Sequence, residues 1–326
     1  MPSEAARVAD PQPSEFAGES AGQGARRLFP ACRPKFFPAS VLPVLAGTAW
    51  GVQAACSLDV LAFLLALVAT VCVHAGANVI NDVGDESGGT DRQNTDRIYP
   101  YTGGSRFIQT GIMDASAMAR LGTSLLAVAA IAGLLLILMK GTVVLAFGLA
   151  GVLLAVLYSI GPVRLASVGV GETAIFIAFG VLPVTGAAWL QSGQLDVSSL
   201  IFSVPIGAWV AAILLINVVP DIAADSATGK RTLPVRFGLG GTALIYIALN
   251  LAALAAVVQL TMTGALPLLA PLLPVGLVLL AAKASAAIRR GIADRDAMTK
   301  AIESTLAIHT LGSVWLTGVA IYLAIR

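Results

Sequence analysis

The sequence predicts an all-α, polytopic membrane protein with nine transmembrane helices. The chain has 326 residues, of which 57% are hydrophobic and only 12% are charged, about half the charged fraction of a typical soluble domain. Apolar runs close to twenty residues long recur along most of the sequence, and a helix of that length spans a bilayer. The basic residues are concentrated in alternate loops, as expected for a chain that crosses a membrane repeatedly.

The first 34 residues differ from the rest. They are polar, rich in Ala, Ser, Pro, Glu and Arg, and contain no apolar region of the signal-peptide type. We therefore expect residues 1–34 to form a disordered cytoplasmic tail and residues 35–326 to form one transmembrane domain. The nine predicted spans cover residues 38–56, 58–81, 115–139, 141–159, 170–191, 197–219, 241–263, 267–286 and 303–325.

The distribution of positive charge predicts the orientation. If the N-terminus lies in the cytoplasm, 18 of the 20 Lys and Arg residues fall on the cytoplasmic side, and only Lys140 and Arg326 fall on the other. The two long polar loops, residues 82–114 and 220–240, are then also cytoplasmic. Because long polar loops commonly carry function, we expect the active site on this side of an integral protein of the plasma or inner membrane.

Two acidic clusters follow apolar runs at this side. Each cluster has an Asn one helical turn before its first Asp, and its polar residues share one helix face. The clusters are Asn78, Asp82 and Asp85, and Asn217, Asp221 and Asp225. Hard divalent cations such as Mg²⁺ prefer carboxylate oxygens and often share them with a substrate phosphate. We therefore expect the four aspartates to hold Mg²⁺ across one central cavity that opens to the cytoplasmic side.

Basic residues follow both clusters and could bind a phosphate group. Arg97 and Arg106 flank Gly103–Gly104–Ser105, whose backbone amides could face an anion. Lys230 and Arg231 come soon after Asp225. Contact with anionic lipid headgroups or ordinary membrane topology explains such residues equally well.

Three further residues lie near the predicted site. Tyr158 and Arg164, in the loop after the fourth span, could meet an aromatic carboxylate. His74 lies one turn before Asn78, and a polar contact between helices is the simpler expectation for it. The three cysteines have neither metal nor redox spacing. The sequence contains no Walker loop and no dinucleotide fingerprint. Because the chain is predicted to lie in a membrane, we do not expect it to bind nucleic acid, although its loops are basic.

These residues carry a resemblance to the UbiA superfamily of intramembrane aromatic prenyltransferases, over about residues 35–326. The first motif of that family, N-D-x-x-D-x-x-x-D, is matched by Asn81, Asp82 and Asp85. Its last position is Gly89 here, and Asp91 is the candidate substitute. Asp221 and Asp225 match the second motif, D-x-x-x-D.

Three stretches are most similar to the 1,4-dihydroxy-2-naphthoate polyprenyltransferases of menaquinone synthesis. They are residues 103–111, 158–172 and 221–232. The resemblance implies Mg²⁺-dependent transfer of a polyprenyl group from its diphosphate to an aromatic acceptor, with Asn78, Asn81 and Asn217 among the substrate-binding residues. Acceptors such as 4-hydroxybenzoate, homogentisate or another phenol are the alternatives. A transporter with intramembrane carboxylates is an alternative from a different class.

Overall fold

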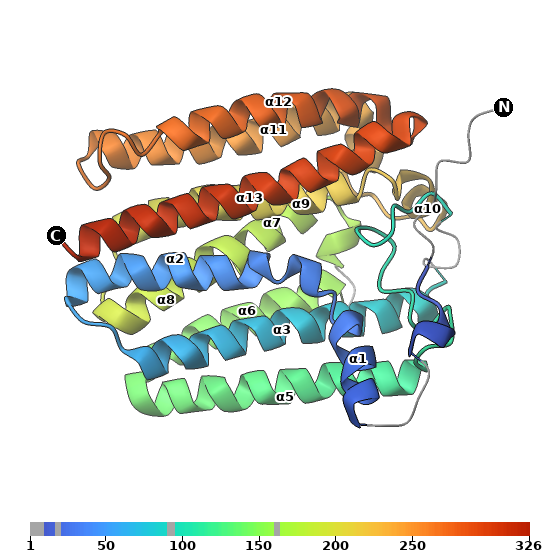
Figure 1. Ribbon diagram of the computed structural model, residues 1–326, viewed down its shortest axis with the longest axis horizontal. Helices are drawn as coiled ribbons and strands as arrows, with labels where there is room; N and C mark the ends of the chain where they lie inside the picture. The colour runs from blue at the N-terminus through green and yellow to red at the C-terminus, as the bar shows by residue number, and fades with distance from the viewer. Residues whose placement is uncertain (1–9, 17–20, 90–94, 160–163) are drawn as a thin grey trace.

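The computed structural model describes residues 10–16, 21–89, 95–159 and 164–326. Within these ranges the chain is helical and contains no strand, as predicted. The principal helices lie alongside one another, and α10 and the loop after α3 lie at one end of the bundle, opposite the C-terminus (Figure 1). The helices are α1 (Ala21–Ala31), α2 (Pro38–Ala55), α3 (Val60–Ser87), α5 (Ala115–Lys140), α6 (Val143–Ser159), α7 (Gly171–Phe176), α8 (Leu182–Ser192), α9 (Val197–Asn217), α10 (Ile222–Ala227), α11 (Leu233–Met262), α12 (Leu272–Arg290) and α13 (Arg295–Ala324). Short 3₁₀ turns are η1 (Pro13–Phe16), η2 (Pro34–Phe36), η3 (Leu165–Ser167) and η5 (Gly291–Asp294), and η4 (Ile177–Val181) is a π-helical turn.

Six helical stretches in the described part of the chain are long and apolar enough to cross a membrane: Val60–Ser87, Ala115–Lys140, Gly171–Ser192, Val197–Asn217, Leu233–Met262 and Leu272–Ala324. The chain is therefore an integral membrane protein. The third stretch joins α7 and α8 through η4, and the last joins α12 and α13 through η5. Helices α2 and α6 are shorter.

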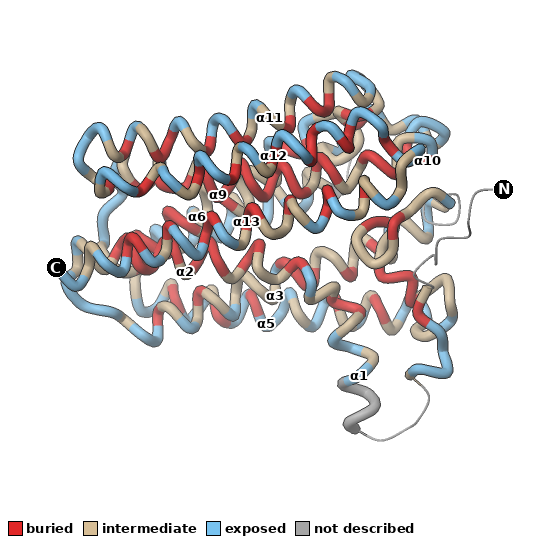
Figure 2. The backbone as a smooth tube through the Cα atoms, turned by 45° about the horizontal axis from the view of Figure 1, so that its top comes forward, coloured by how far each residue is buried: buried red, intermediate tan, exposed pale blue. Residues whose placement is uncertain are grey.

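Helix α9 is the centre of the bundle. In its most apolar window 78% of residues are buried, against 22% in α5 at the periphery. Trp209 of α9 is buried against Gly312 of α13, where an added Cβ would lie 2.4 Å from the indole ring. Helix α11 shows buried and exposed residues in alternation (Figure 2), as expected for a helix with one side toward the bundle and the other toward lipid.

Small residues allow close helix packing. A Cβ on Gly47 of α2 would lie 2.2 Å from the Val184 carbonyl oxygen of α8, and one on Gly51 would lie 2.3 Å from that of Ala188. The backbones of α2 and α8 are thus in direct contact, and a larger residue at either position would separate them.

Part of the predicted tail is folded in this structure. Residues 13–16 form η1 and residues 21–31 form α1, which crosses the direction of α3 and α5 (Figure 1). Phe16 packs edge-on against Phe107, so aromatic contact offsets the polar composition of the segment. Residues 1–9 and 17–20 lie outside the described ranges, and the full extent of the tail stays a prediction.

Candidate active site

An internal cavity of about 350 Å³ lies among α3, α6, α7–η4, α9 and α10. Nine side chains singled out in the sequence line it: His74, Asn78, Asn81, Asp85, Tyr158, Asn217, Asp221, Asp225 and Lys230. Gly103 and Gly104 of the loop after α3 also line it, whereas its inner wall is mostly apolar and includes Phe179, Val210 and Ile213 beside His74. The C-terminal ends of α3 and α9, which belong to opposite halves of the chain, therefore line the same cavity.

The first acidic cluster lies on a continuous helix. Helix α3 runs six residues beyond the predicted span and ends at Ser87. The Asn81 Nδ2 donates a hydrogen bond of 2.8 Å to the Asp85 Oδ2. This bond fixes the orientation of the carboxylate one turn after the amide.

The second cluster departs from the predicted single helix face. Helix α9 ends at Asn217, and α10 starts at Ile222 with Asp221 as its N-cap residue. Pro220 lies in between; it has no amide hydrogen and restricts the residue before it. The resulting turn still brings Asn217, Asp221 and Asp225 to the same cavity.

Lys230 links the two clusters. Its Nζ lies 3.7 Å from the Asp85 Oδ1 and 3.5 Å from the Asp225 Oδ1. Burial lowers the pKa of Lys230, but Asp85 and Asp225 outweigh burial and raise this pKa above its ordinary value. Burial also raises the pKa of the Asp225 carboxyl, and Lys230 offsets only part of that rise. The carboxylates of the two clusters therefore already share one cation.

Two asparagines in the cavity wall have buried polar atoms without a hydrogen-bond partner among the residues that the structure describes. They are the Asn78 Nδ2 and the Asn217 Oδ1. Because buried polar atoms in native proteins are normally paired, this arrangement indicates a polar ligand between α3 and α9.

Asp82 lies elsewhere. It is 3% exposed and is not part of the cavity lining. Its Oδ2 accepts a hydrogen bond of 2.9 Å from the backbone amide of Ser105, whereas its Oδ1 is buried and has no hydrogen-bond partner among the described residues. Its assignment as a metal ligand stays a prediction.

The predicted arginines also lie outside the cavity lining. Arg97 forms an ion pair of 2.5 Å with Asp10, and the Arg106 Nε lies 3.6 Å from the same carboxylate. Arg164 and Arg231 are exposed, and the Arg231 amide donates to the Ser167 carbonyl at 2.6 Å. Asp91 falls outside the described residues.

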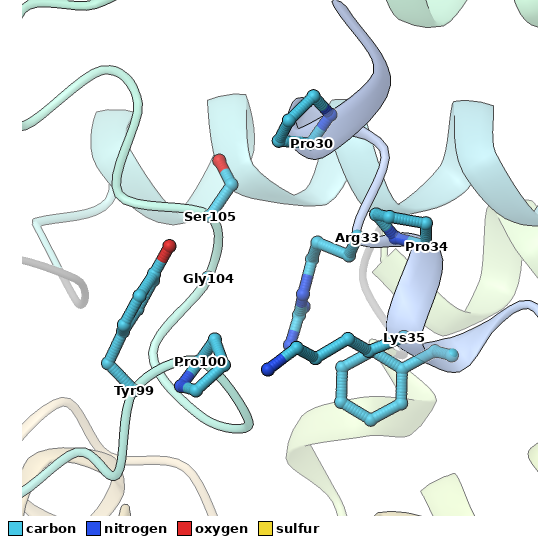
Figure 3. Close-up of a pocket in the computed structure, with 9 residues that line it drawn as sticks. Pro30, Arg33, Pro34, Lys35, Tyr99, Pro100, Gly104 and Ser105 are labelled. Carbon is cyan, nitrogen blue, oxygen red and sulfur yellow. The ribbon is translucent and has the colours of Figure 1, made fainter. Parts of the chain in front are cut away.

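Sequence reasoning missed Arg33, which it assigned to the tail. Arg33 lines the cavity and also a smaller pocket of about 130 Å³. In that pocket Arg33 and Lys35 reach from the N-terminal segment toward Tyr99–Ser105 (Figure 3). A lone arginine in a polar segment gives no sequence signal for this position.

His74 has the contact that its spacing suggested. Its Nδ1 is hydrogen-bonded to the Ser40 hydroxyl of α2, and its ring packs edge-on against Phe179 at 4.7 Å. It is buried and forms part of the cavity wall.

The carboxylates that line the cavity suit a divalent cation that is also bound by oxygen atoms of a ligand. Among the described residues no three His, Cys, Asp or Glu side chains are gathered closely enough to enclose a metal by themselves. The acids lie on two sides of the cavity around the Lys230 ammonium. A hard cation that takes some of its oxygen ligands from a phosphate needs such an open arrangement.

These features define a class: an integral membrane protein with an internal acidic site for a cationic or cation-bound ligand, next to an apolar wall. A family model described as the UbiA prenyltransferase family matches residues 40–311. The chain therefore belongs to the UbiA prenyltransferase family. It is an enzyme, and this decides against the transporter alternative.

Named relatives agree with this assignment. The 1,4-dihydroxy-2-naphthoate octaprenyltransferase of Mycobacterium tuberculosis is 32% identical over 293 residues, which cover 88% of this chain and 93% of that protein. UbiA prenyltransferase domain-containing protein 1 of Xenopus tropicalis is 30% identical over 64% of this chain and 59% of that protein. The structure of a UbiA homolog from Archaeoglobus fulgidus bound to GPP and Mg²⁺ has a TM-score of 0.66 at 15% identity, covering 91% of this chain and 99% of that one. This last similarity establishes the fold.

Proposed function

We propose that the protein transfers a polyprenyl group from an allylic polyprenyl diphosphate to 1,4-dihydroxy-2-naphthoate in menaquinone synthesis. The observation that carries the proposal is the position of Asp85, Asp225 and Lys230 at one end of a cavity whose inner wall is apolar. A polar end suits a diphosphate, and an apolar wall suits its hydrocarbon chain. The name of the Mycobacterium tuberculosis relative supports the choice of acceptor.

We infer that Asp85, Asp221 and Asp225 hold Mg²⁺, together with oxygens of the diphosphate. When bound, Mg²⁺ supplies positive charge that stabilises the departing diphosphate. The unpaired Asn217 Oδ1 and the carboxylates are oxygen donors of the type that Mg²⁺ accepts. The solved Archaeoglobus fulgidus homolog is bound to GPP and Mg²⁺, which supports the same use of the fold here.

The residues of the chain have separable roles in this reaction. The Lys230 ammonium, held between Asp85 and Asp225, would supply positive charge where the diphosphate is proposed to bind, and this charge would favour departure of the diphosphate from the prenyl carbon. The Asn78 amide and the backbone around Gly103 and Gly104 offer hydrogen-bond donors to phosphate oxygens. The apolar side chains exclude water, which would otherwise capture the allylic cation.

The electron-rich ring of the acceptor then forms a carbon–carbon bond to the prenyl cation. With 1,4-dihydroxy-2-naphthoate the carboxylate leaves as CO₂, and the product is a demethylmenaquinol, the hydroquinone form of a demethylmenaquinone. Tyr158 lines the cavity and is a candidate contact for the acceptor, and Arg164 stays a weaker one because it is exposed. The sequence-based assignment of Arg97, Arg106 and Arg231 to the diphosphate also stays a proposal.

The proposed topology has nine spans and a cavity that opens to the cytoplasm. The nine spans are the six long helical stretches, with α12 and α13 counted as two spans, together with the shorter helices α2 and α6. The cytoplasmic orientation is supported by the location of the basic residues in the loops at the cavity end.

The test is a reconstituted assay. Purified protein in detergent is incubated with Mg²⁺, labelled geranylgeranyl diphosphate and either 1,4-dihydroxy-2-naphthoate, 4-hydroxybenzoate or homogentisate. We expect a prenylated product whose mass reflects loss of CO₂ with the naphthoate alone, and no product after addition of EDTA. Preferential prenylation of another acceptor would contradict the assignment to menaquinone synthesis.

A further inference from the structure

The acidic residues at the end of α3 lie on two different sides of the helix. Asn78, Asn81 and Asp85 line the cavity. Asp82 follows Asn81 directly, so its side chain lies about 100° around the helix from that of Asn81. Val79 and Ala75, one and two turns before Asp82, are buried in a hydrophobic cluster with Phe107 and Met118. The Asp82 side of α3 therefore faces protein and not the cavity.

The loop after α3 folds back along this second side and contacts it at three successive turns. Val79 shares the hydrophobic cluster with Phe107, the Asp82 Oδ2 accepts from the Ser105 amide at 2.9 Å, and the Glu86 Oε2 accepts from the Gln109 Nε2 at 2.9 Å. Val79, Asp82 and Glu86 are three and four residues apart, the spacing of neighbours on one helix face. The polar contact at Asp82 is thus one of a series that aligns the loop with α3.

The packing of this loop against α3 determines which backbone groups line the polar end of the cavity. Gly103 and Gly104 line the cavity, and Ser105 follows them directly. Both glycines have left-handed backbone, with φ of 79° and 76°, so few other residues could hold this turn. A bond from the Ser105 amide to a buried carboxylate fixes the turn at its C-terminal edge.

We propose that Asp82 is a positioning residue, which holds the Gly103–Ser105 loop against the cavity, and that Asn81 and Asp85 are the groups of the first motif that act on the ligand. This inference rests on the proposed function, because the loop is positioned for a prenyl diphosphate.

Asparagine at position 82 separates the two roles. Its side-chain oxygen still accepts the Ser105 amide hydrogen, but it has no negative charge. A positioning role therefore survives Asp82→Asn and is lost in Asp82→Leu, which has no acceptor. A metal-binding role is impaired in both variants.

The experiment compares Asp82→Asn, Asp82→Leu and Asp85→Asn for dependence on Mg²⁺ and for KM of the prenyl diphosphate. We expect Asp82→Asn to keep the Mg²⁺ concentration for half-maximal rate within about threefold, whereas Asp85→Asn raises it on the order of tenfold or more. Asp82→Leu should raise KM for the diphosphate more than it lowers kcat. An equal Mg²⁺ shift in Asp82→Asn and Asp85→Asn would overturn the proposal.

A second readout needs neither metal nor turnover. Cys32 is 7% exposed and belongs to the same hydrophobic cluster as Phe107. In a Cys56→Ser/Cys72→Ser background without Mg²⁺, maleimide should label Cys32 faster in Asp82→Leu than in Asp82→Asn or Asp85→Asn. Unchanged protection of Cys32 in Asp82→Leu would contradict the positioning role. If no variant and no wild-type protein transferred a prenyl group, the proposed function would fail, but the Cys32 comparison would still test the role of Asp82.

Discussion

The ammonium group of Lys230 lies 3.7 Å from the carboxylate of Asp85, although the two residues belong to opposite halves of the chain. The same nitrogen lies 3.5 Å from Asp225. Lys230 is therefore the point at which the two acidic clusters meet, and it is a better candidate for the diphosphate site than the exposed Arg231 beside it.

Substitution of Lys230 by Gln should weaken binding of the prenyl diphosphate. Loss of a charge-assisted hydrogen bond costs about 1.5–3 kcal/mol, so KM for the diphosphate is expected to rise at least tenfold, with a smaller change in KM for the acceptor. Arg231→Gln is the matched neighbour and should change either KM by less than about threefold, because the Arg231 side chain is exposed and its charge is screened by solvent. The check is initial-rate kinetics with each substrate varied in turn, and equal effects of the two variants would count against the role of Lys230.

The N-terminal segment should limit access of anions to the loop arginines. Asp10 pairs with Arg97 and approaches Arg106. Because partly exposed ion pairs contribute about 0.2–1 kcal/mol, Asp10→Asn should lower KM for the prenyl diphosphate by at most about fivefold. Gln12→Ala, two residues away in the same segment, is the control. A rise in KM in Asp10→Asn would show that Asp10 supports the site and does not compete for it.

The orientation of the chain can be read with a native cysteine. Cys56 is exposed at the end of α2, and Ser87 is exposed at the end of α3, on the cavity side. In spheroplasts of a Cys32→Ser/Cys72→Ser variant, an impermeant maleimide should label Cys56 from outside. With Cys56 also replaced, Ser87→Cys should be labelled only after permeabilisation. The reverse pattern would place the cavity on the non-cytoplasmic side.

Close packing of α2 on α8 gives a prediction about stability. A methyl group on Gly47 would collide with the Val184 backbone, whereas one on Gly133 of α5 would meet no atom within 4 Å. Gly47→Ala should destabilise the protein by about 1–3 kcal/mol, as overpacking does, and Gly133→Ala should leave stability unchanged or raise it slightly. Thermal unfolding in detergent compares them, and equal midpoints would contradict the close contact.

Periodicity and charge predicted the helical membrane fold because they depend on local sequence and on the bilayer. They also identified Asn78, Asp85, Asn217 and Lys230 as neighbours of one cavity. They could not predict that the helix is interrupted at Pro220. The spacing of Asn217, Asp221 and Asp225 is compatible with one continuous helix and also with two helices joined by a turn. Nor could they separate Asp82 from Asp85, since that distinction depends on where the loop after α3 packs.

The central claim is that the two acidic clusters act as one site on one diphosphate. A double-mutant cycle on Asp85 and Asp225 tests it most directly, because both carboxylates contact Lys230. Mg²⁺-dependent prenyl transfer is measured for Asp85→Asn, Asp225→Asn and the double variant, each purified in detergent and confirmed as monodisperse. We expect each single change to lower kcat/KM on the order of 100-fold, and the double variant to be little worse, since residues that act as a unit are not additive. Near wild-type turnover in either single variant, or a double variant whose loss equals the product of the two, would contradict a shared site.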